Sequence, residues 1–214
     1  MGPMALSGIG WPVDAGVRGR DERREWRGRH GDHVRRAVPE ALTMTAPRVI
    51  AHLLPALGAI PNHPRWPLLV YPGAVALGGS DPAAIFERLF DRNRWPAAWR
   101  NGVFPFHHYH STAHEALGVY SGEVTVQFGG DVGVIVTARS GDVVVLPAGT
   151  GHKKLASSSA LGIVGAYPEG QHPDTCTPVT ASGQRSAEAV ARVPLPACDP
   201  VFGAGGPLFE HWKA

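Results

Sequence analysis

The sequence predicts an all-β fold, because short strand-like segments alternate with turns over most of its length. The chain has 27 glycines and 20 prolines among 214 residues, and such an excess favours many turns over long helices. Hydrophobic residues make up 43% of the chain, which is enough to build a core. Strand-like segments recur about every 8–12 residues, as in sandwiches and barrels. Since no internal repeat is visible, we expect a single β-barrel with extensions.

The first 43 residues differ in composition from the rest and predict a disordered, arginine-rich extension. They hold eight arginines and six acidic residues without apolar periodicity, which is typical of a segment that cannot form a packed core. The interspersed acids argue against a nucleic-acid-binding arm. Residues 44–214 contain twelve basic and twelve acidic residues. We therefore expect this second segment to form the domain and to bind no nucleic acid.

Two strands and one helix are predicted in the first part of the domain. The strands cover residues 49–54 and 67–75, which are bounded by prolines and glycines. A helix begins at Asp81-Pro82, with Asp81 as the N-cap and Pro82 in the first turn. The apolar face of this helix, which we expect to pack on the barrel, consists of Ile85, Phe86, Leu89 and Phe90.

Beyond Gly102 the pattern is that of strands alone. Apolar and polar residues alternate with a period of two, or form short apolar runs between glycine-containing turns. The predicted strands cover residues 124–128, 132–136, 143–146 and 161–167. After Pro168 the chain is rich in proline, so an irregular C-terminal segment is expected. The apolar residues within 193–212 should pack back onto the body of the domain.

A cluster of histidines carries the functional signal. The chain has eleven histidines, of which four lie between residues 107 and 114. In a strand, alternate residues face the same side, so His108 and His110 should project together. Glu115 begins the next apolar run, and His152 ends a tight turn later in the chain. Three imidazoles and one carboxylate inside a barrel would suit Fe(II), Mn(II), Co(II), Ni(II) or Zn(II), with positions left open for substrate.

Residues next to these ligands are expected to serve packing. His107 and His114 should leave the opposite face of the strand, where they are structural or orient the ligands. Phe104 and Phe106 alternate ahead of the ligands and are predicted to lie in the core rather than against a substrate.

Charged residues near the predicted site have two interpretations. Lys153 and Lys154 follow the tight turn and are expected in solvent, and the alternative is that one of them holds an anionic substrate. His172 and Asp174 lie in the irregular C-terminal segment. They are candidates for capping the pocket.

The spacing of these residues resembles the two motifs of the cupins. The first motif, G-x5-H-x-H-x3–4-E-x6-G, is matched by Gly102, His108, His110, Glu115 and Gly122. The second, G-x5-P-x-G-x2-H-x3-N, is matched by Gly141, Pro147, Gly149 and His152, with Ala156 in place of the final asparagine. The strings HHYHSTAHE and PAGTGHK look like those of the YjlB-like single-domain cupins. The resemblance implies one double-stranded β-helix, or jelly-roll, barrel with a metal-binding core over about residues 102–168.

This resemblance fixes no reaction, so several functions stay open. The favoured hypothesis is an enzyme that acts on a small organic substrate at one divalent metal ion per subunit. An oxygen-dependent, dioxygenase-type oxidation fits open coordination positions, and Glu115 is a possible catalytic residue that detaches or accepts a proton. The alternatives are a metal-assisted isomerase or decarboxylase, and a non-catalytic module that binds or senses a small ligand.

Cysteine usage and hydropathy indicate the surroundings of the protein. Cys176 and Cys198 lack any CxxC spacing and are expected to be free thiols in a reducing compartment, with a single bridge as the alternative. No apolar stretch reaches the roughly 20 residues of a membrane helix. We therefore expect a cytoplasmic protein without a membrane partner. The apolar segment 49–71 is predicted to pair with a second copy and form a homodimer in which each subunit keeps its own metal site.

Overall fold

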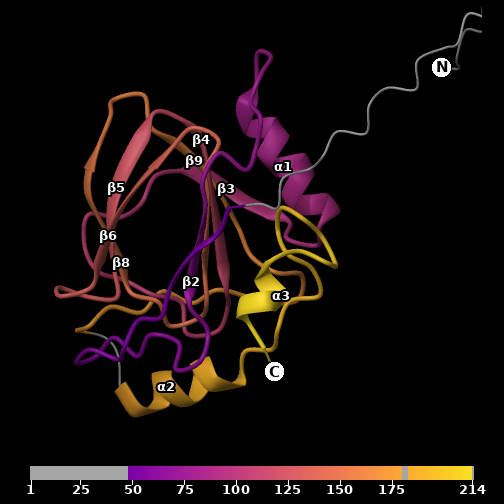
Figure 1. The fold of residues 1–214 in the computed structure, drawn as a ribbon. Coiled ribbons are helices and arrows are strands. Elements are labelled where there is room, and N and C mark those ends of the chain that lie inside the picture. Colours follow the sequence, from indigo (N-terminus) through magenta and orange to yellow (C-terminus); the bar gives the residue numbers. More distant parts are fainter. Residues whose placement is uncertain (1–47, 180–182, 214) are drawn as a thin grey trace, which may run out of the picture. The chain divides into compact units, whose positions relative to one another are not determined.

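The computed structural model describes residues 48–179 and 183–213. The predicted extension over residues 1–43 lies outside these ranges. The described strands form two antiparallel sheets that face each other (Figure 1). The all-β jelly-roll fold is therefore confirmed, although the two sheets are not joined into one closed barrel.

The larger sheet has six strands. Their order across the sheet is β1 (Ile50–His52), β2 (Leu68–Tyr71), β7 (Val143–Leu146), β4 (Glu115–Ser121), β9 (Gly162–Ala166) and β3 (Ala97–Asn101). The smaller sheet has the order β6 (Val134–Arg139), β5 (Glu123–Phe128) and β8 (His152–Ser157). The helices are α1 (Pro82–Arg92), α2 (Gly183–Arg192) and α3 (Leu208–His211).

Both faces of the larger sheet are covered by apolar side chains. Between the sheets, residues such as Leu117 on β4 and Val126 on β5 share one core. On the outer face, α1 and the C-terminal segment form a second core that includes Phe86, Phe90 and Trp212. Because they are buried on both faces, β2, β7 and β9 are continuous apolar runs rather than alternating patterns.

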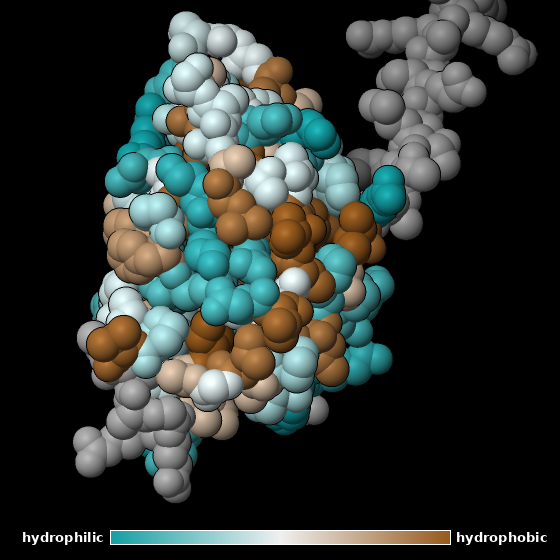
Figure 2. Space-filling view, turned by 90° about the vertical axis from the view of Figure 1, so that its left-hand side faces the viewer, coloured by the Kyte–Doolittle hydropathy of each residue, from teal (hydrophilic) through white to brown (hydrophobic). Residues whose placement is uncertain are grey.

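The smaller sheet has a different outer face. Figure 2 looks onto this side of the molecule and shows hydrophobic patches interrupted by hydrophilic side chains. Ile135 and Leu155 are among the exposed large hydrophobic residues, whereas Thr125 and Thr137 form a hydrogen bond of 3.0 Å across neighbouring strands. The alternation predicted for β5 follows from this arrangement, since only one face of the sheet is buried.

Some predicted elements are confirmed and others differ. Asp81 caps α1, because its Oδ1 accepts a hydrogen bond of 3.2 Å from the Ala84 amide. The C-terminal region, which was expected to be irregular, contains helix α2. The strands β3 and β8 were not predicted, because their sequences, AAWRN and HKKLAS, lack a clear apolar alternation.

The structure also bears on two expectations, which concern the state of the cysteines and a membrane-spanning segment. Cys176 and Cys198 are free thiols and form no disulfide with each other. None of the helices in the described ranges has the length and apolar character needed to cross a bilayer.

Candidate metal centre

Backbone pairing brings two of the predicted ligands together. His152 is the first residue of β8, and His108 lies in the segment before β4. Each donates its backbone amide to the carbonyl of the other, at 3.2 and 2.9 Å, which places their ring centroids 4.0 Å apart. His110 is linked to the turn that precedes His152, because the His110 carbonyl accepts a 2.7 Å hydrogen bond from the Gly149 amide. Gly149 has a φ of 84°, a conformation that favours glycine.

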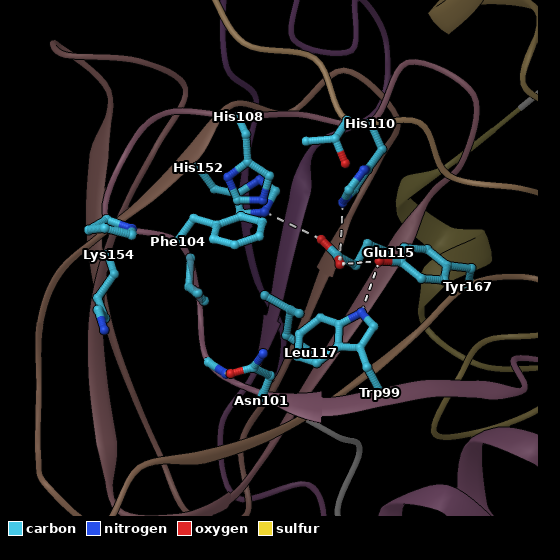
Figure 3. A pocket seen from close by; sticks show the side chains of 14 residues that line it. Trp99, Asn101, Phe104, His108, His110, Glu115, Leu117, His152, Lys154 and Tyr167 are labelled. Atoms are coloured by element: carbon cyan, nitrogen blue, oxygen red, sulfur yellow. Dashed lines mark hydrogen bonds and ion pairs between the residues drawn. The ribbon is translucent and has the colours of Figure 1, made fainter.

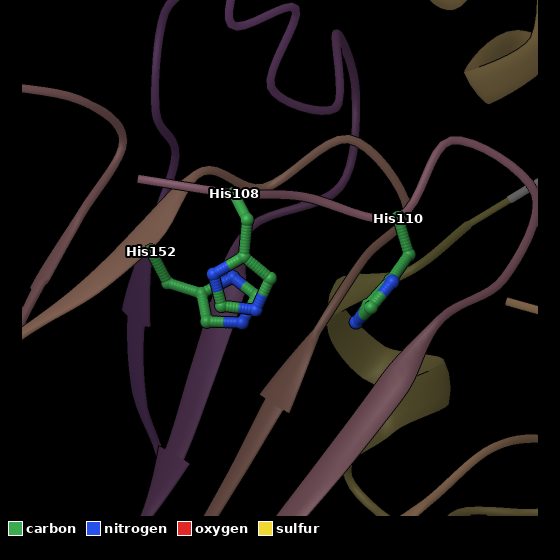
Figure 4. A group of neighbouring side chains, drawn as sticks. All are labelled: His108, His110 and His152. Atoms are coloured by element: carbon green, nitrogen blue, oxygen red, sulfur yellow. The ribbon is translucent and has the colours of Figure 1, made fainter. Parts of the chain in front are cut away.

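The three imidazoles are oriented through their Nδ1 atoms. Nδ1 of His108 lies 3.4 Å from the Phe106 carbonyl oxygen, and Nδ1 of His152 lies 3.0 Å from that of Thr150. Nδ1 of His110 is bonded to the Asp174 carbonyl. Each bond commits Nδ1 as the donor, so in the neutral ring Nε2 carries no proton and can bind a metal ion. Figure 4 shows the three rings converging on a common space.

Glu115 completes the group of predicted ligands. It begins β4 and is only 2% exposed. Its carboxylate oxygens lie 3.5 Å from Nε2 of His110 and 3.4 Å from Nε2 of His152. Tyr167 donates its hydroxyl to Oε1 at 3.1 Å, and Trp99 donates Nε1 to that hydroxyl oxygen at 3.0 Å (Figure 3). The carboxylate is thus held by the two histidines and by the Tyr167 hydroxyl.

The protonation of the group reflects its burial and its charges. Burial raises the pKa of Glu115, but His110, His152 and His108 outweigh this effect and bring it to about 2. Burial lowers the pKa of His110, but Glu115 outweighs it and raises the pKa to about 9. Burial, with the neighbouring His108, lowers the pKa of His152 to about 3. A metal ion that binds here would displace a proton from His110.

The group fits a divalent metal ion. Ligand atoms of His108, His110 and His152 all lie within 4.8 Å of one another, and the three residues are buried. Oε2 of Glu115 is buried without a hydrogen-bond partner, and a bound cation would satisfy it. Metal–ligand bonds of about 2.0–2.2 Å place adjacent ligand atoms roughly 3 Å apart, which is near the 3.5 and 3.4 Å between the Glu115 oxygens and Nε2 of His110 and His152. The histidine triad can therefore hold a metal ion.

A cavity of about 370 Å³ opens beside this group. The apolar part of its walls includes Trp99, Leu117 and Phe104 (Figure 3). Asn101 and Lys154 add polar groups to the lining. The four predicted ligands also line the cavity, so a molecule inside it would lie against them.

Residues 171–176 form a clasp on the segment that carries His110. The Asp174 carboxylate accepts hydrogen bonds from the Ser111 amide at 2.6 Å and from its hydroxyl at 2.5 Å. The Tyr109 and Cys176 amides and carbonyls pair at 2.9 Å. The backbone carbonyl of Asp174 also accepts from His110. In the sequence, Asp174 is a candidate for capping the pocket. Its contact with His110, a predicted metal ligand, depends on the path of an irregular segment, which the sequence does not predict.

His114 lies away from the predicted ligands, in a separate aromatic cluster with His63, Trp66 and Trp212. Its Nδ1 accepts from the Ala148 amide at 2.9 Å, and its Nε2 lies 3.1 Å from the Pro194 carbonyl oxygen. His63 stacks on Trp66 with centroids 4.2 Å apart, and Trp66 stacks on Trp212 at 5.4 Å. No pattern in the sequence points to this cluster, since it joins residues from three distant parts of the chain.

Three other expectations have mixed outcomes. Phe104 and Phe106 were predicted in the core, which is wrong: they are 49% and 47% exposed and stack on each other at 5.0 Å. Their segment runs along the edge of β8 at the pocket instead of entering the sheet. Nε2 of His107, which was expected to face away from the ligands, lies 3.2 Å from Oδ1 of the exposed Asp131. Of the two lysines, Lys153 bonds Asp131 at 3.0 Å, whereas Lys154 lines the cavity.

A jelly-roll of two sheets with a histidine triad inside it is the architecture of a cupin. The uncharacterized protein YjlB of Bacillus subtilis (strain 168) is 42% identical to this chain over 161 residues, which are 75% of this chain and 94% of that protein. The chain therefore belongs to the YjlB family of cupins. No protein-family model matches the chain.

Solved structures with some similarity share less of the sequence. A DUF861 family protein from Thermotoga maritima is 24% identical, with a TM-score of 0.26, and the match covers 42% of this chain and 96% of that one. The dTDP-6-deoxy-D-glucose-3,5-epimerase of Legionella pneumophila is 17% identical, with a TM-score of 0.31, over 58% of this chain and 74% of that one. The assignment to the family rests on the YjlB sequence.

Proposed function

We propose that the protein is a metal-dependent enzyme that acts on a small organic molecule in the cavity beside the histidine triad. The observation that carries this proposal is the position of the predicted ligands, which are buried and yet form one wall of the cavity. His108, His110, His152 and Glu115 would hold the ion. A divalent ion such as Fe(II) would supply a Lewis acid and positions for oxygen-containing ligands.

The favoured reaction is an oxygen-dependent oxidation, because the pocket offers few groups that could act as a general base. The Glu115 carboxylate is committed to two histidines and a tyrosine, and its low pKa favours a ligand over a proton acceptor. Burial, with the adjacent Glu115, raises the pKa of Tyr167, so this phenol stays protonated. An isomerase that works by proton transfer would need a base that takes up a proton in the reaction.

The chain's own residues would orient the ion and the substrate. Trp99 and Tyr167 form a relay of hydrogen bonds that fixes the Glu115 carboxylate. Gly165 makes this possible, since a Cβ atom there would lie 2.0 Å from the Trp99 ring. The apolar walls would exclude water from the bound substrate.

Oxygen uptake tests this proposal. Iron-loaded protein is incubated with small carboxylic acids, phenols and diketones in an oxygen electrode, and products are followed by NMR. We expect uptake with at least one compound, and its loss in His110→Ala but not in the surface variant Lys153→Met. Turnover without oxygen uptake would favour isomerisation or decarboxylation. Binding without turnover would favour a sensing module.

We also propose a homodimer. Strand β1 lies at the edge of the larger sheet and pairs only with β2 among the described strands, so its other edge is open to a second copy. Light scattering should then give twice the chain mass. A mass near 22.7 kDa would contradict this prediction.

A further inference from the structure

We infer that the cavity takes a small carboxylate with an apolar body, and that Lys154 binds the carboxylate group. This inference rests on the proposed function and names the substrate class of the same site. Lys154 is the one lysine or arginine among the described residues that line the cavity. It lies across the cavity from Trp99 and Tyr167 (Figure 3).

The strand pattern of β8 directs Lys154 inward. Alternate residues of a strand share a face, and Lys154 follows His152 by two positions. These two residues pair with Val126 and Phe128, which are both buried between the sheets. Lys153, by contrast, faces outward and bonds Asp131 at 3.0 Å. At about 3.3 Å per residue, Lys154 and His152 are roughly 7 Å apart along the strand, a distance that a small ligand can span.

Within the described residues, the Lys154 ammonium has no partner of its own. It forms no ion pair or hydrogen bond through its side chain with any residue in the described ranges. Glu115 is the one carboxylate among the described residues of the cavity lining. It is engaged by His110, His152 and Tyr167. With a divalent ion bound, the cavity would carry net positive charge and attract an anion. Lys154 is a half-buried residue, and an anionic ligand in the cavity would supply its ammonium with a counterion.

The remaining walls fit an apolar body. Phe104 stacks on Phe106 and makes a T-shaped contact with the His108 ring, with the ring centroids 4.9 Å apart. Its backbone is fixed next to the lysine, because its carbonyl accepts a 2.9 Å hydrogen bond from the Lys154 amide. Exposed aromatic rings that line a cavity are suited to packing against a flat or apolar ligand. Among the described residues, the lining offers one ammonium and no guanidinium. A single lysine matches the one negative charge of a carboxylate better than the nearly two charges of a phosphate group, so the anion we infer is a carboxylate.

Titration calorimetry with benzoate and the neutral benzamide tests the inference on metal-loaded protein. The wild type should bind benzoate at least tenfold more tightly than benzamide. Lys154→Met should remove this preference, and Lys154→Arg should largely retain it. Lys153→Met is the matched control, since it removes the neighbouring outward-facing charge, and it should bind like the wild type. The melting temperature of each variant shows that the fold is intact.

Two outcomes would overturn the inference. One is equal binding, or no binding, of both probes by the wild type. The other is an unchanged benzoate preference in Lys154→Met, which would assign the preference to the metal ion alone. Elemental analysis of the same samples separates this test from the proposed function. If the protein holds no metal, the proposed function fails, while a benzoate preference that depends on Lys154 still supports the carboxylate site.

Discussion

The protein buries histidines in two clusters that use their ring nitrogens differently. In the aromatic cluster, His114 commits both nitrogens to backbone groups at 2.9 and 3.1 Å. In the triad, each ring commits only Nδ1 to a backbone carbonyl. The Nε2 atoms of His110 and His152 instead lie beside the Glu115 carboxylate.

This difference separates a structural histidine from a candidate ligand. A buried imidazole whose two nitrogens are satisfied by the backbone behaves as a neutral cross-link. His114 joins the start of β4 to the turn before β8 and to the C-terminal segment, so it holds the metal-ligand segments without facing the cavity. A buried imidazole with a free nitrogen needs a partner, and a metal ion is one that several histidines can share.

Replacing His114 should have the largest effect on stability. His114→Ala leaves the Ala148 amide without its partner, removes one of the two hydrogen bonds to the Pro194 carbonyl, and opens space beside Trp66 and Trp212. We expect the free energy of unfolding to fall by about 3–4 kcal/mol, as measured by denaturant unfolding. The metal content of the folded fraction should change little. Loss of metal at unchanged stability would contradict the division between the clusters.

The aromatic cluster should also make stability depend on pH. Burial, with the nearby Arg65, lowers the pKa of His63 from 6.5 to about 4. The unfolded chain therefore binds a proton more readily, so this contribution to stability is complete above pH 6.5 and is lost as the pH falls towards 4. The free energy of unfolding should therefore fall by about 3 kcal/mol over this pH range.

His63→Asn tests this contribution. Asparagine can still accept from the Trp66 amide, which lies 2.9 Å from Nδ1 of His63, but it does not titrate. The variant should be less stable at pH 7, and its stability should fall less between pH 6.5 and 4 than that of the wild type. Denaturant unfolding at several pH values measures both slopes. Equal slopes would show that His63 is not the titrating group.

Loosening the clasp on His110 should have a smaller effect, confined to the metal centre. Asp174→Ala removes two hydrogen bonds to Ser111, so the carbonyl that orients His110 is less well fixed. We expect metal affinity to fall about tenfold in a competition titration with a chelator. Glu169→Ala is the matched control, because this nearby carboxylate bonds the exposed Arg94. Equal affinity in both variants would remove the positioning role of Asp174.

The sequence predicted the repeating parts of the fold better than the irregular ones. The strands β5 and β7 and the cap of α1 have local signals, namely a period of two, an apolar run and an Asp-Pro pair. The four candidate ligands were identified from spacing, and the structure brings their side chains together. The clasp by Asp174, the outward position of Phe104 and the packing of His114 depend on irregular segments that meet only in the folded chain.

The metal content of the purified protein tests the central claim most directly. Elemental analysis should find about one divalent ion per chain in the wild type. His108→Ala, His110→Ala and His152→Ala should each hold less than half of that content, because each removes one of three converging ligands. Full occupancy in two of these three variants, or no metal in wild-type protein after incubation with divalent ions, would contradict the assignment.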